Sequence, residues 1–218
     1  MKIGILGTGV VGQALGAKLV QLAHEVKMGS RTADSPKAHA WAQANGPQAS
    51  HGTFADAAAF GEILFNCTAG VHSLEALELA GAVHLRGKIL VDVANPLDFS
   101  QGMPPSLAFC NTDSLGERVQ RAFPEAKVVK TLNTVNCSVM VNPALAGGEH
   151  DMFICGNDGG AKATVAGILK EWFGWNSVID VGDIRAARAM EMLLPMWIAL
   201  WGVLDTPIFG WRVVRDAR

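Results

Sequence analysis

The feature that most constrains this chain is an apolar strand that runs directly into a glycine turn and a helix. Residues 2–6 are mostly apolar, and Gly7, Gly9 and Gly12 follow in the spacing G-x-G-x-x-G. In a dinucleotide-binding turn the first glycine allows the tight bend, the second lets backbone approach a diphosphate, and the third lets helix pack on strand. The helix is predicted by apolar residues at helical spacing, at Val11, Leu15, Leu19 and Leu22. Its N-terminus offers free N–H groups to the diphosphate, which predicts contacts from Gly7, Thr8, Gly9, Val10, Val11 and Gly12.

The end of the second predicted strand indicates which dinucleotide binds. A site specific for NAD places Asp or Glu about 20 residues past the glycines, where it holds the ribose 2′-hydroxyl. This chain has Gly29-Ser30-Arg31 there and no carboxylate before Asp34. A serine hydroxyl and a guanidinium suit a 2′-phosphate, and Lys37 adds a positive charge. We expect NADP(H) to bind at Ser30, Arg31 and Lys37; the alternative is that Arg31 is a solvated loop arginine.

The rest of the chain alternates between predicted strands and helices, as an α/β fold does. Strands are expected over 61–67, 88–94, 128–132, 152–155 and 177–180. Helices are expected over 72–79, 161–173 and 184–204, the last with a kink or break at Pro195. The pattern predicts a doubly wound, Rossmann-type parallel sheet with a small C-terminal α/β extension. We expect a dinucleotide-binding domain over 1–140 and a continuous C-terminal part over 141–218.

Ligands of an open parallel sheet bind beyond the carboxyl ends of its strands. Three short segments follow predicted strands and therefore line the expected site. They contribute Thr68, Ala69 and Gly70, then Asn95, Pro96 and Leu97, and finally Asn133, Asn136 and Cys137. For Cys137 the alternative is a small buried residue with no reactive thiol.

Composition excludes several classes of function. The 18 basic and 20 acidic residues give a net charge of −2. The sequence has no basic tract interleaved with aromatic residues, so we do not expect it to bind nucleic acid. The four cysteines are scattered without metal-ligand spacing, so we expect free thiols and no metal site. The chain opens on a core strand, so we expect a cytoplasmic protein without a signal peptide. The uncharged segment 192–204 is shorter than a membrane span requires and is expected to be a buried helix or a dimer contact.

The chemistry is narrowed by the proton donors that are missing. The chain contains no tyrosine, which excludes carbonyl reductases that protonate an alkoxide with Tyr. Of the six histidines only His72 follows a predicted strand end closely, and a helix-start or surface role is its alternative. Lys130 and Asn133 superficially match the Lys and Asn pair of hydroxyacid dehydrogenases, but those enzymes carry the Lys on a helix. No catalytic side chain is assigned, and a hydride exchange between two cofactors is favoured because it needs positioning more than acid–base catalysis.

Over nearly its whole length the sequence resembles the NADPH-dependent F420 reductases (F420H2:NADP oxidoreductases), with the NADP-binding domain of the STEAP metalloreductases as a relative. The glycine turn and Gly29-Ser30-Arg31 match the family's NADP site, and Asn95-Pro96-Leu97 resembles its Ser-Pro-Leu. Cys155-Gly-Asn-Asp158 and Arg188-x-x-Glu191 resemble two later signatures of the family. Archaeal members carry Pro-Trp where this chain has Ala69-Gly70 and His in place of Asn133. This difference implies a more open nicotinamide pocket.

The sequence and the resemblance together predict an NADP(H)-dependent oxidoreductase that transfers a hydride between NADPH and F420 or a flavin. Asn133 and Asn136 are expected to contact this acceptor, and the apolar C-terminal helix is a candidate dimer contact. One alternative is an imine or carbonyl reductase of the pyrroline-carboxylate reductase kind. The other is a non-catalytic NADPH sensor that presents its C-terminal helix to a partner.

Overall fold

The computed structural model describes residues 1–216 and gives the following elements along the chain. The first half contains β1 (Lys2–Leu6), α1 (Val10–Gln21), β2 (Glu25–Ser30), α2 (Pro36–Asn45), β3 (Ala49–Thr53), α3 (Phe54–Phe60), β4 (Ile63–Asn66), η1 (Gly70–His72), α4 (Ser73–Ala80), α5 (Ala82–Leu85) and β5 (Ile89–Asp92). The second half contains β6 (Leu97–Asp98), β7 (Ser106–Leu107), α6 (Leu115–Ala122), β8 (Lys127–Thr131), α7 (Cys137–Val141), η2 (Pro143–Ala146), β9 (Asp151–Gly156), α8 (Gly159–Glu171), β10 (Ser177–Asp180), η3 (Ile184–Ala186) and α9 (Ala187–Leu204).

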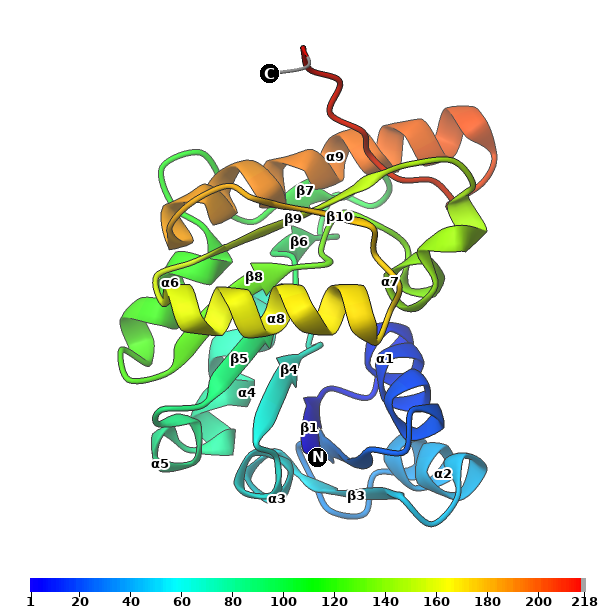
Figure 1. Ribbon diagram of the computed structural model, residues 1–218. Helices are drawn as coiled ribbons and strands as arrows, with labels where there is room; N and C mark the ends of the chain where they lie inside the picture. Colours follow the sequence, from blue (N-terminus) through cyan, green and yellow to red (C-terminus); the bar gives the residue numbers. More distant parts are fainter. Residues whose placement is uncertain (217–218) are drawn as a thin grey trace.

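Eight strands form one sheet in the order β10-β9-β8-β5-β4-β1-β2-β3 (Figure 1). Six neighbouring strands of this sheet are parallel to one another, namely β8, β5, β4, β1, β2 and β3. β10 is parallel to β9. The pair β8–β9 is antiparallel, so the last two strands run against the others. The predicted doubly wound, Rossmann-type α/β fold is confirmed, and its sheet is parallel except at this pair.

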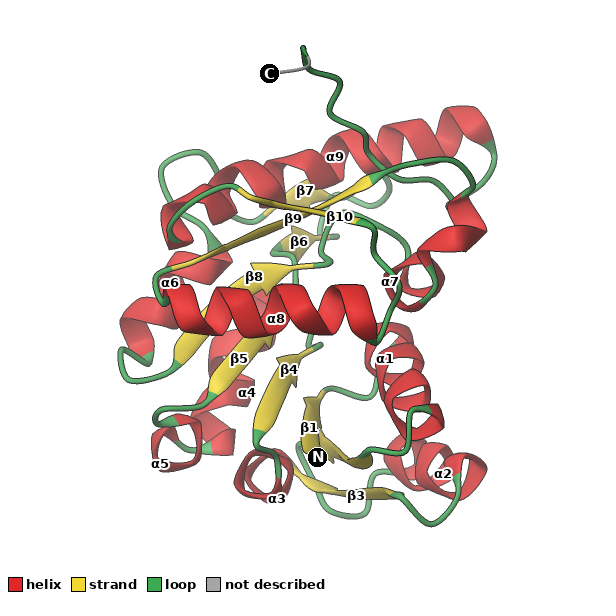
Figure 2. Ribbon diagram, in the orientation of Figure 1, coloured by secondary structure: helices red, strands yellow, loops and turns green. Residues whose placement is uncertain are grey.

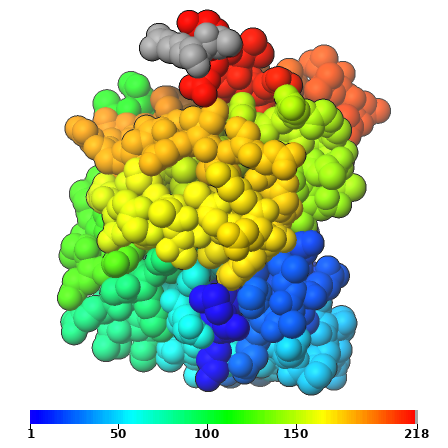
Figure 3. All heavy atoms as spheres, viewed as in Figure 1, coloured from blue at the N-terminus to red at the C-terminus, as the bar shows by residue number. Residues whose placement is uncertain are grey.

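Helices cover both faces of the sheet (Figure 2). Buried side chains of α1, α2, α7 and α8 form one core with the strands, and those of α3, α4, α6 and α9 form a second core on the opposite face. In the space-filling view the region of α8 covers the middle of the visible face (Figure 3). The strands between the two cores are almost completely buried, which explains their continuous apolar runs.

The first strand and helix form as their sequence predicts. β1 is buried from Ile3 to Leu6, and Leu15 and Leu19 of α1 are fully buried against the sheet. Val11 is partly buried on the same core, whereas Leu22 caps the helix C-terminus and is 37% exposed. The predicted stripe therefore holds for its first three residues, and Leu22 lies outside it.

The C-terminal part continues the same sheet through the β8–β9 pair. The fully buried Trp175 and the strands of the first half belong to one core cluster. The division at residue 140 stays a prediction. The expected break at Pro195 is absent, because α9 is one uninterrupted helix through this residue. After β5, the short strands β6 and β7 form a two-stranded antiparallel ribbon.

One helix, over Ile184–Leu204, is long and apolar enough to cross a membrane by length and composition. Its buried face contacts the second core through Ala187 and Met190. Its exposed apolar side chains are Met192, Met196, Trp201, Val203 and Leu204.

Candidate cofactor and acceptor site

The glycine turn after β1 has the geometry that a diphosphate requires. Gly7 has φ +119°, and a Cβ there would lie 2.6 Å from the carbonyl oxygen of Cys67. A Cβ on Gly12 would collide with the carbonyl oxygen of Gly7, so this glycine lets α1 start close to the turn. A Cβ on Gly9, in contrast, would meet no atom within 4 Å. Gly9 thus leaves open space at the N-terminus of α1, where a diphosphate oxygen would receive backbone N–H groups.

A cavity of about 420 Å³ extends from this turn across the ends of β2 and β4, and we call it the cofactor cavity. The Ser30 hydroxyl donates to the carbonyl oxygen of Thr32 at 2.5 Å and lies 3.4 Å from that of Gly52, so it shapes the turn. The Arg31 side chain is exposed and, among residues 1–216, has no ion pair. A free guanidinium at this place fits a 2′-phosphate. The predicted residues that line the cavity are Gly7, Thr8, Gly9, Ser30, Arg31, Thr68 and Ala69.

The structure does not bring Lys37 to the cofactor cavity. Lys37 lies near the start of α2 and lines a separate hollow between α1 and α2, together with Gln13 and Trp41. Arg31 is therefore the cation that this arrangement offers to a 2′-phosphate.

A second cavity, of about 470 Å³, lies over the ends of β4, β5 and β8, and we call it the acceptor cavity. It is bounded on one side by Leu194 and Trp197 of α9. Four residues on the turn after β4 line both cavities, namely Cys67, Thr68, Ala69 and His72. The predicted residues that line it are Val10, Val11, Thr68, Ala69, Gly70, Asn95, Leu97, Asn133, Asn136 and Cys137.

Besides Lys37, two predicted residues line neither cavity. Gly12 is buried at the start of α1, and Pro96 is buried within the segment that follows β5. A Cβ on Gly70 would collide with the carbonyl oxygen of Asn95, so the segments after β4 and β5 are in direct contact. Gly70, whose lack of a side chain is expected to open the nicotinamide pocket, is thus also required for this packing.

Asn95 and Asn133 join the segments after β5 and β8. Asn95 Nδ2 donates to the Asn133 carbonyl oxygen at 2.8 Å, and Asn133 Nδ2 donates to Asn95 Oδ1 at 2.9 Å. Asn133 Nδ2 also donates to the carbonyl oxygen of Met190 in α9 at 3.1 Å. The amide of Asn133 is therefore fixed with its nitrogen toward these acceptors.

Two buried polar atoms on residues of the acceptor cavity have no partner among residues 1–216. They are Asn133 Oδ1, an acceptor, and Trp197 Nε1, a donor. Both residues are more than nine-tenths buried. Unpaired buried polar atoms are rare in native proteins, so each of these two is a candidate for a ligand contact.

One titratable group that lines both cavities, the Cys67 thiol, is a poor acid. Burial raises the pKa of the Cys67 thiol far above its usual range, and the nearby Asp92 carboxylate adds to the shift. Cys137 is half-buried. His72 has a side chain that is 57% exposed and lies 3.7 Å from the Glu75 carboxylate. The four cysteines are free, as expected.

A buried charge cluster beneath the acceptor cavity was missed in the sequence. Lys130 of β8 is fully buried, and its Nζ lies 2.8 Å from Asp92 Oδ2 and 3.0 Å from Glu191 Oε1. Nζ also donates to the carbonyl oxygen of Ala94, which lines the cavity. Burial lowers the pKa of Lys130, but the two carboxylates outweigh burial and hold it above its usual value. Lys130 thus serves as a structural cation, and it would have been recognised only by knowing its partners in space.

The later signature residues hold helices in place. Asp158 caps the N-terminus of α8 through a 2.7 Å bond from the Ala161 N–H. The Glu191 carboxylate accepts the backbone N–H groups of Leu115 and Gly116 at the start of α6, at 2.8 and 3.1 Å. Arg188 of α9 forms an ion pair with Glu117 of α6. These residues attach α9 and α6 to the sheet.

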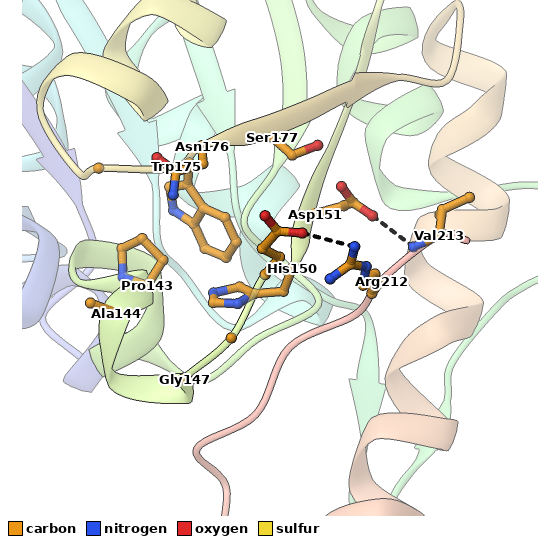
Figure 4. A pocket seen from close by; sticks show the side chains of 13 residues that line it. Pro143, Ala144, Gly147, His150, Asp151, Trp175, Asn176, Ser177, Arg212 and Val213 are labelled. Carbon is orange, nitrogen blue, oxygen red and sulfur yellow. Dashed lines mark hydrogen bonds and ion pairs between the residues drawn. The ribbon is translucent and has the colours of Figure 1, made fainter. Parts of the chain in front are cut away.

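A further cavity lies beside η2 and the C-terminal segment (Figure 4). His150 packs against Trp175 there with ring centroids 5.2 Å apart, and Arg212 is paired with Glu149 at 2.8 Å. This cavity shares no lining residue with the cofactor or acceptor cavity. It is therefore not part of the predicted site.

The chain is similar to a known protein family and to several solved structures. Residues 2–96 match the family described as NADP oxidoreductase, coenzyme F420-dependent. A crystal structure from Arthrobacter sp. FB24, with the provisional name of an F420-dependent NADP-reductase, is 52% identical and superposes with a TM-score of 0.93. The match covers 99% of this chain and 100% of that one. A reductive aminase from Aspergillus terreus in complex with NADPH is 20% identical with a TM-score of 0.65, covers 94% and 62% of the two chains, and shows the fold alone.

Curated relatives are longer than this chain. The metalloreductase STEAP3 of Rattus norvegicus is 31% identical over 202 residues, which are 90% of this chain and 38% of the relative. The human metalloreductase STEAP2 is 26% identical, over 98% of this chain and 41% of the relative. The chain thus spans about two fifths of the length of these relatives. From the near-complete match to the Arthrobacter protein and the matched family region, we conclude that this chain belongs to the family of F420-dependent NADP oxidoreductases and is an NADP(H)-dependent oxidoreductase.

Proposed function

We propose that the protein transfers a hydride between NADPH and a flat acceptor of the deazaflavin F420 or flavin type. The observation that carries this proposal is the junction of the two cavities at the turn after β4. A dinucleotide with its diphosphate at Gly9 and its 2′-phosphate at Arg31 would extend its nicotinamide toward that junction. Bound NADPH supplies a hydride from C4 of its dihydronicotinamide ring.

The chain's own residues position the two reactants. The turn at Gly7–Gly12 and Arg31 would hold the dinucleotide, and the Asn95–Asn133 pair would fix the floor of the acceptor cavity. Leu194 and Trp197 of α9 would cover an aromatic ring and exclude water. Trp197 is itself stacked on Phe209 with ring centroids 5.4 Å apart, which keeps its indole in place.

The unpaired polar atoms favour an acceptor with an amide-type edge. Asn133 Oδ1 would accept from an N–H and Trp197 Nε1 would donate to a carbonyl oxygen. The imide edge of a flavin or deazaflavin and the carboxamide of nicotinamide each offer both groups. The proposal assigns Asn133 and Asn136 to the acceptor side of the site.

The acid–base inventory of the acceptor cavity also supports hydride exchange. The chain has no tyrosine, and the raised pKa of Cys67 disfavours its thiolate. Reduction of a deazaflavin takes one hydride and one proton, and the proton would come from solvent. An imine or carbonyl reductase would instead need an acid beside the substrate, and exposed His72 is the remaining candidate. The 52% identical Arthrobacter protein, named for F420 and NADP, adds support.

The proposal is tested by mixing the protein with NADPH under anaerobic conditions and adding oxidised F420, FMN or FAD separately. Loss of acceptor absorbance at a rate that depends on protein concentration is expected for at least one of the three. A cyclic imine is the control acceptor. Turnover of the imine without turnover of F420 or a flavin would overturn the proposal in favour of imine reduction. Tight NADPH binding with no turnover of any acceptor would favour an NADPH sensor.

A further inference from the structure

Thr68 occupies the junction of the two cavities and belongs to a buried polar chain. Its Oγ1 lies 2.7 Å from Asn66 Oδ1 and 2.7 Å from Ser73 Oγ. Asn66 and Ser73 are fully buried, so no solvent replaces them. The hydroxyl of Thr68 thus has two fixed partners on its protein side.

The orientation of Asn66 decides which way the proton of Thr68 points. Asn66 Nδ2 donates to Asp92 Oδ1 at 2.9 Å and to Ser73 Oγ at 3.1 Å. The amide oxygen must then face Thr68, and an amide oxygen only accepts. Thr68 therefore donates its proton inward to Asn66. Ser73, which receives a proton from Asn66, donates its own to Thr68.

Asp92 and Lys130 lock this orientation. Asp92 Oδ2 accepts from the Lys130 ammonium at 2.8 Å, and both side chains are fully buried. A carboxylate paired with an ammonium is an acceptor, so a flipped Asn66 would place its oxygen against Asp92 Oδ1. Such a contact between two acceptors in a buried site is strongly unfavourable. Asn66 is thus held in a single orientation.

We propose that Thr68 is a hydrogen-bond acceptor for the nicotinamide mononucleotide half of NADP(H), and that Asn66 and Asp92 are positioning residues for it. A hydroxyl has one proton and two lone pairs. The proton is used by Asn66 and one lone pair by Ser73, which leaves one lone pair for the cavity. The donors in that half of the cofactor are the ribose hydroxyls and the carboxamide N–H groups. The inference rests on the NADP(H) half of the proposed function and not on the hydride acceptor.

The direction in which the Thr68 hydroxyl donates its proton has a consequence for the reaction. A Thr68 hydroxyl whose proton is held by Asn66 cannot protonate an alkoxide or an amine in the cavity. Its role is to hold the ring that carries the hydride, which agrees with a reaction that depends on positioning.

The test compares dissociation constants for NADPH, measured by calorimetry without any hydride acceptor. Thr68→Val keeps the shape and removes the hydroxyl, and the Kd is expected to rise about five- to tenfold. Thr68→Ser keeps the hydroxyl and is expected to stay within about twofold of the parent. Thr164→Val is the matched control, because the Thr164 hydroxyl bonds the Gly160 carbonyl oxygen on an exposed part of α8. Unchanged affinity in Thr68→Val, or an equal loss in Thr68→Ser, would overturn the proposal.

An analogue separates the two sources of the donor. The 3-acetylpyridine analogue of NADP has a methyl group in place of the carboxamide nitrogen. If the carboxamide is the donor, Thr68→Val binds the analogue as well as the parent does. If a ribose hydroxyl is the donor, Thr68→Val weakens the analogue and NADP equally. If Thr68→Val binds both NADP and the analogue as well as the parent protein does, the assignment of Thr68 to this half is overturned.

The positioning role of Asn66 is tested by a double-mutant cycle with Asn66→Ala. Thr68→Val is expected to change the NADPH Kd less than twofold in this background, because the hydroxyl is no longer oriented. Additive losses would overturn the positioning role. If Asn66→Ala does not fold, Ser73→Ala takes its place. The loss of NADPH affinity in Ser73→Ala is expected to be smaller than the loss in Thr68→Val, and the two losses are not expected to add in the double variant. Additive losses would again overturn the positioning role.

Because binding is measured without an acceptor, the test is independent of which hydride acceptor the protein uses. Failure to find a hydride acceptor would leave the Thr68 result unaffected. Equally, normal NADPH affinity in Thr68→Val would leave hydride transfer to F420 or a flavin untouched.

Discussion

Arg188, in the first turn of α9, donates two hydrogen bonds to the carboxylate of Glu117 on α6, at 2.7 and 2.6 Å. The Glu117 side chain is 7% exposed, and that of Arg188 is 36% exposed. The pair therefore joins two helices that come from distant parts of the chain. The bonds from Arg188 lower the pKa of Glu117, and the Ser114 hydroxyl lowers it further against the opposing effect of burial.

Glu117→Gln is expected to lower the free energy of unfolding at pH 7 by about 1–2 kcal/mol, discounted for the partial exposure of Arg188. Because the pKa of Glu117 is lowered by folding, its contribution is present above the usual carboxyl pKa and is lost as pH falls through the lowered value. The difference between variant and parent is thus expected to shrink below about pH 4. Urea unfolding from pH 7 to pH 3 measures it. Glu125→Gln, at an exposed pair with Arg86, is the control and is expected to have little effect at any pH.

Lys130→Met is expected to destabilise the protein by about 3–5 kcal/mol, because it leaves Asp92 and Glu191 buried without their cation. Lys127→Met on the same strand is the matched control, since Lys127 forms a half-exposed pair with Asp158 at 3.3 Å. The control is expected to lose less than about 1 kcal/mol. Urea unfolding at pH 7 compares the two, and equal losses would show that burial of the charge is not the cause.

Arg31→Asp is expected to weaken NADPH binding by roughly ten- to a hundredfold, which corresponds to a charged hydrogen bond of about 1.5–3 kcal/mol. NADH lacks the 2′-phosphate, so its affinity is expected to stay unchanged. Lys37→Ala is expected to leave both affinities unchanged, because Lys37 lines a separate hollow. Fluorescence titration with both cofactors checks this. An equal loss of NADH affinity would show that Arg31 does not recognise the 2′-phosphate.

Substitutions at Gly9 and Gly12 are expected to impair the protein in different ways. Gly9→Val is expected to keep its melting temperature, because the added atoms start in open space and φ is −75°, but to lose binding of NADPH and NADH alike. Gly12→Ala is expected to lose about 1–3 kcal/mol of stability, because its Cβ meets the Gly7 carbonyl oxygen. Thermal unfolding and cofactor titration of both variants separate the two effects. NADPH binding by Gly9→Val would contradict the assignment of the turn.

The homodimer expected through the C-terminal helix stays a prediction. Trp201 is 42% exposed on α9, beside a hollow that Met103 and Pro104 also line. Trp201→Glu is expected to convert a dimer into a monomer in light scattering coupled to size-exclusion chromatography. Val83→Glu adds the same charge at an exposed site on α5 and is expected to leave the mass unchanged. A monomeric parent protein would remove this prediction.

The sequence predicts the elements whose apolar pattern or glycine spacing is strong. The turn of Gly7, Gly9 and Gly12 and the buried strands β4, β5 and β8 follow directly from such patterns. The edge strand β3, with the sequence Ala-Ser-His-Gly-Thr, carries no strand pattern and is formed by pairing with β2. The reversal between β8 and β9 is also invisible, because a buried strand has the same composition in either direction.

Tertiary contacts explain the other differences. Pro195 removes a hydrogen-bond donor from α9, but it lies on the exposed side of the helix, where water can satisfy the freed carbonyl group. The cluster of Asp92, Lys130 and Glu191 was not predicted, because its members are far apart in sequence and no local spacing links them. The same holds for the orientation of Asn66, which depends on Asp92.

The position of Glu191 in the chain has a consequence for the order in which the protein is made. When synthesis has reached the end of β8, Lys130 has only one of its two counter-charges, Asp92, because Glu191 lies later in the chain. The N–H groups at the start of α6 are likewise without their carboxylate until α9 has emerged from the ribosome. The first half of the chain therefore reaches its final charge balance only after translation of α9, which couples completion of the acceptor cavity to the later part of the chain.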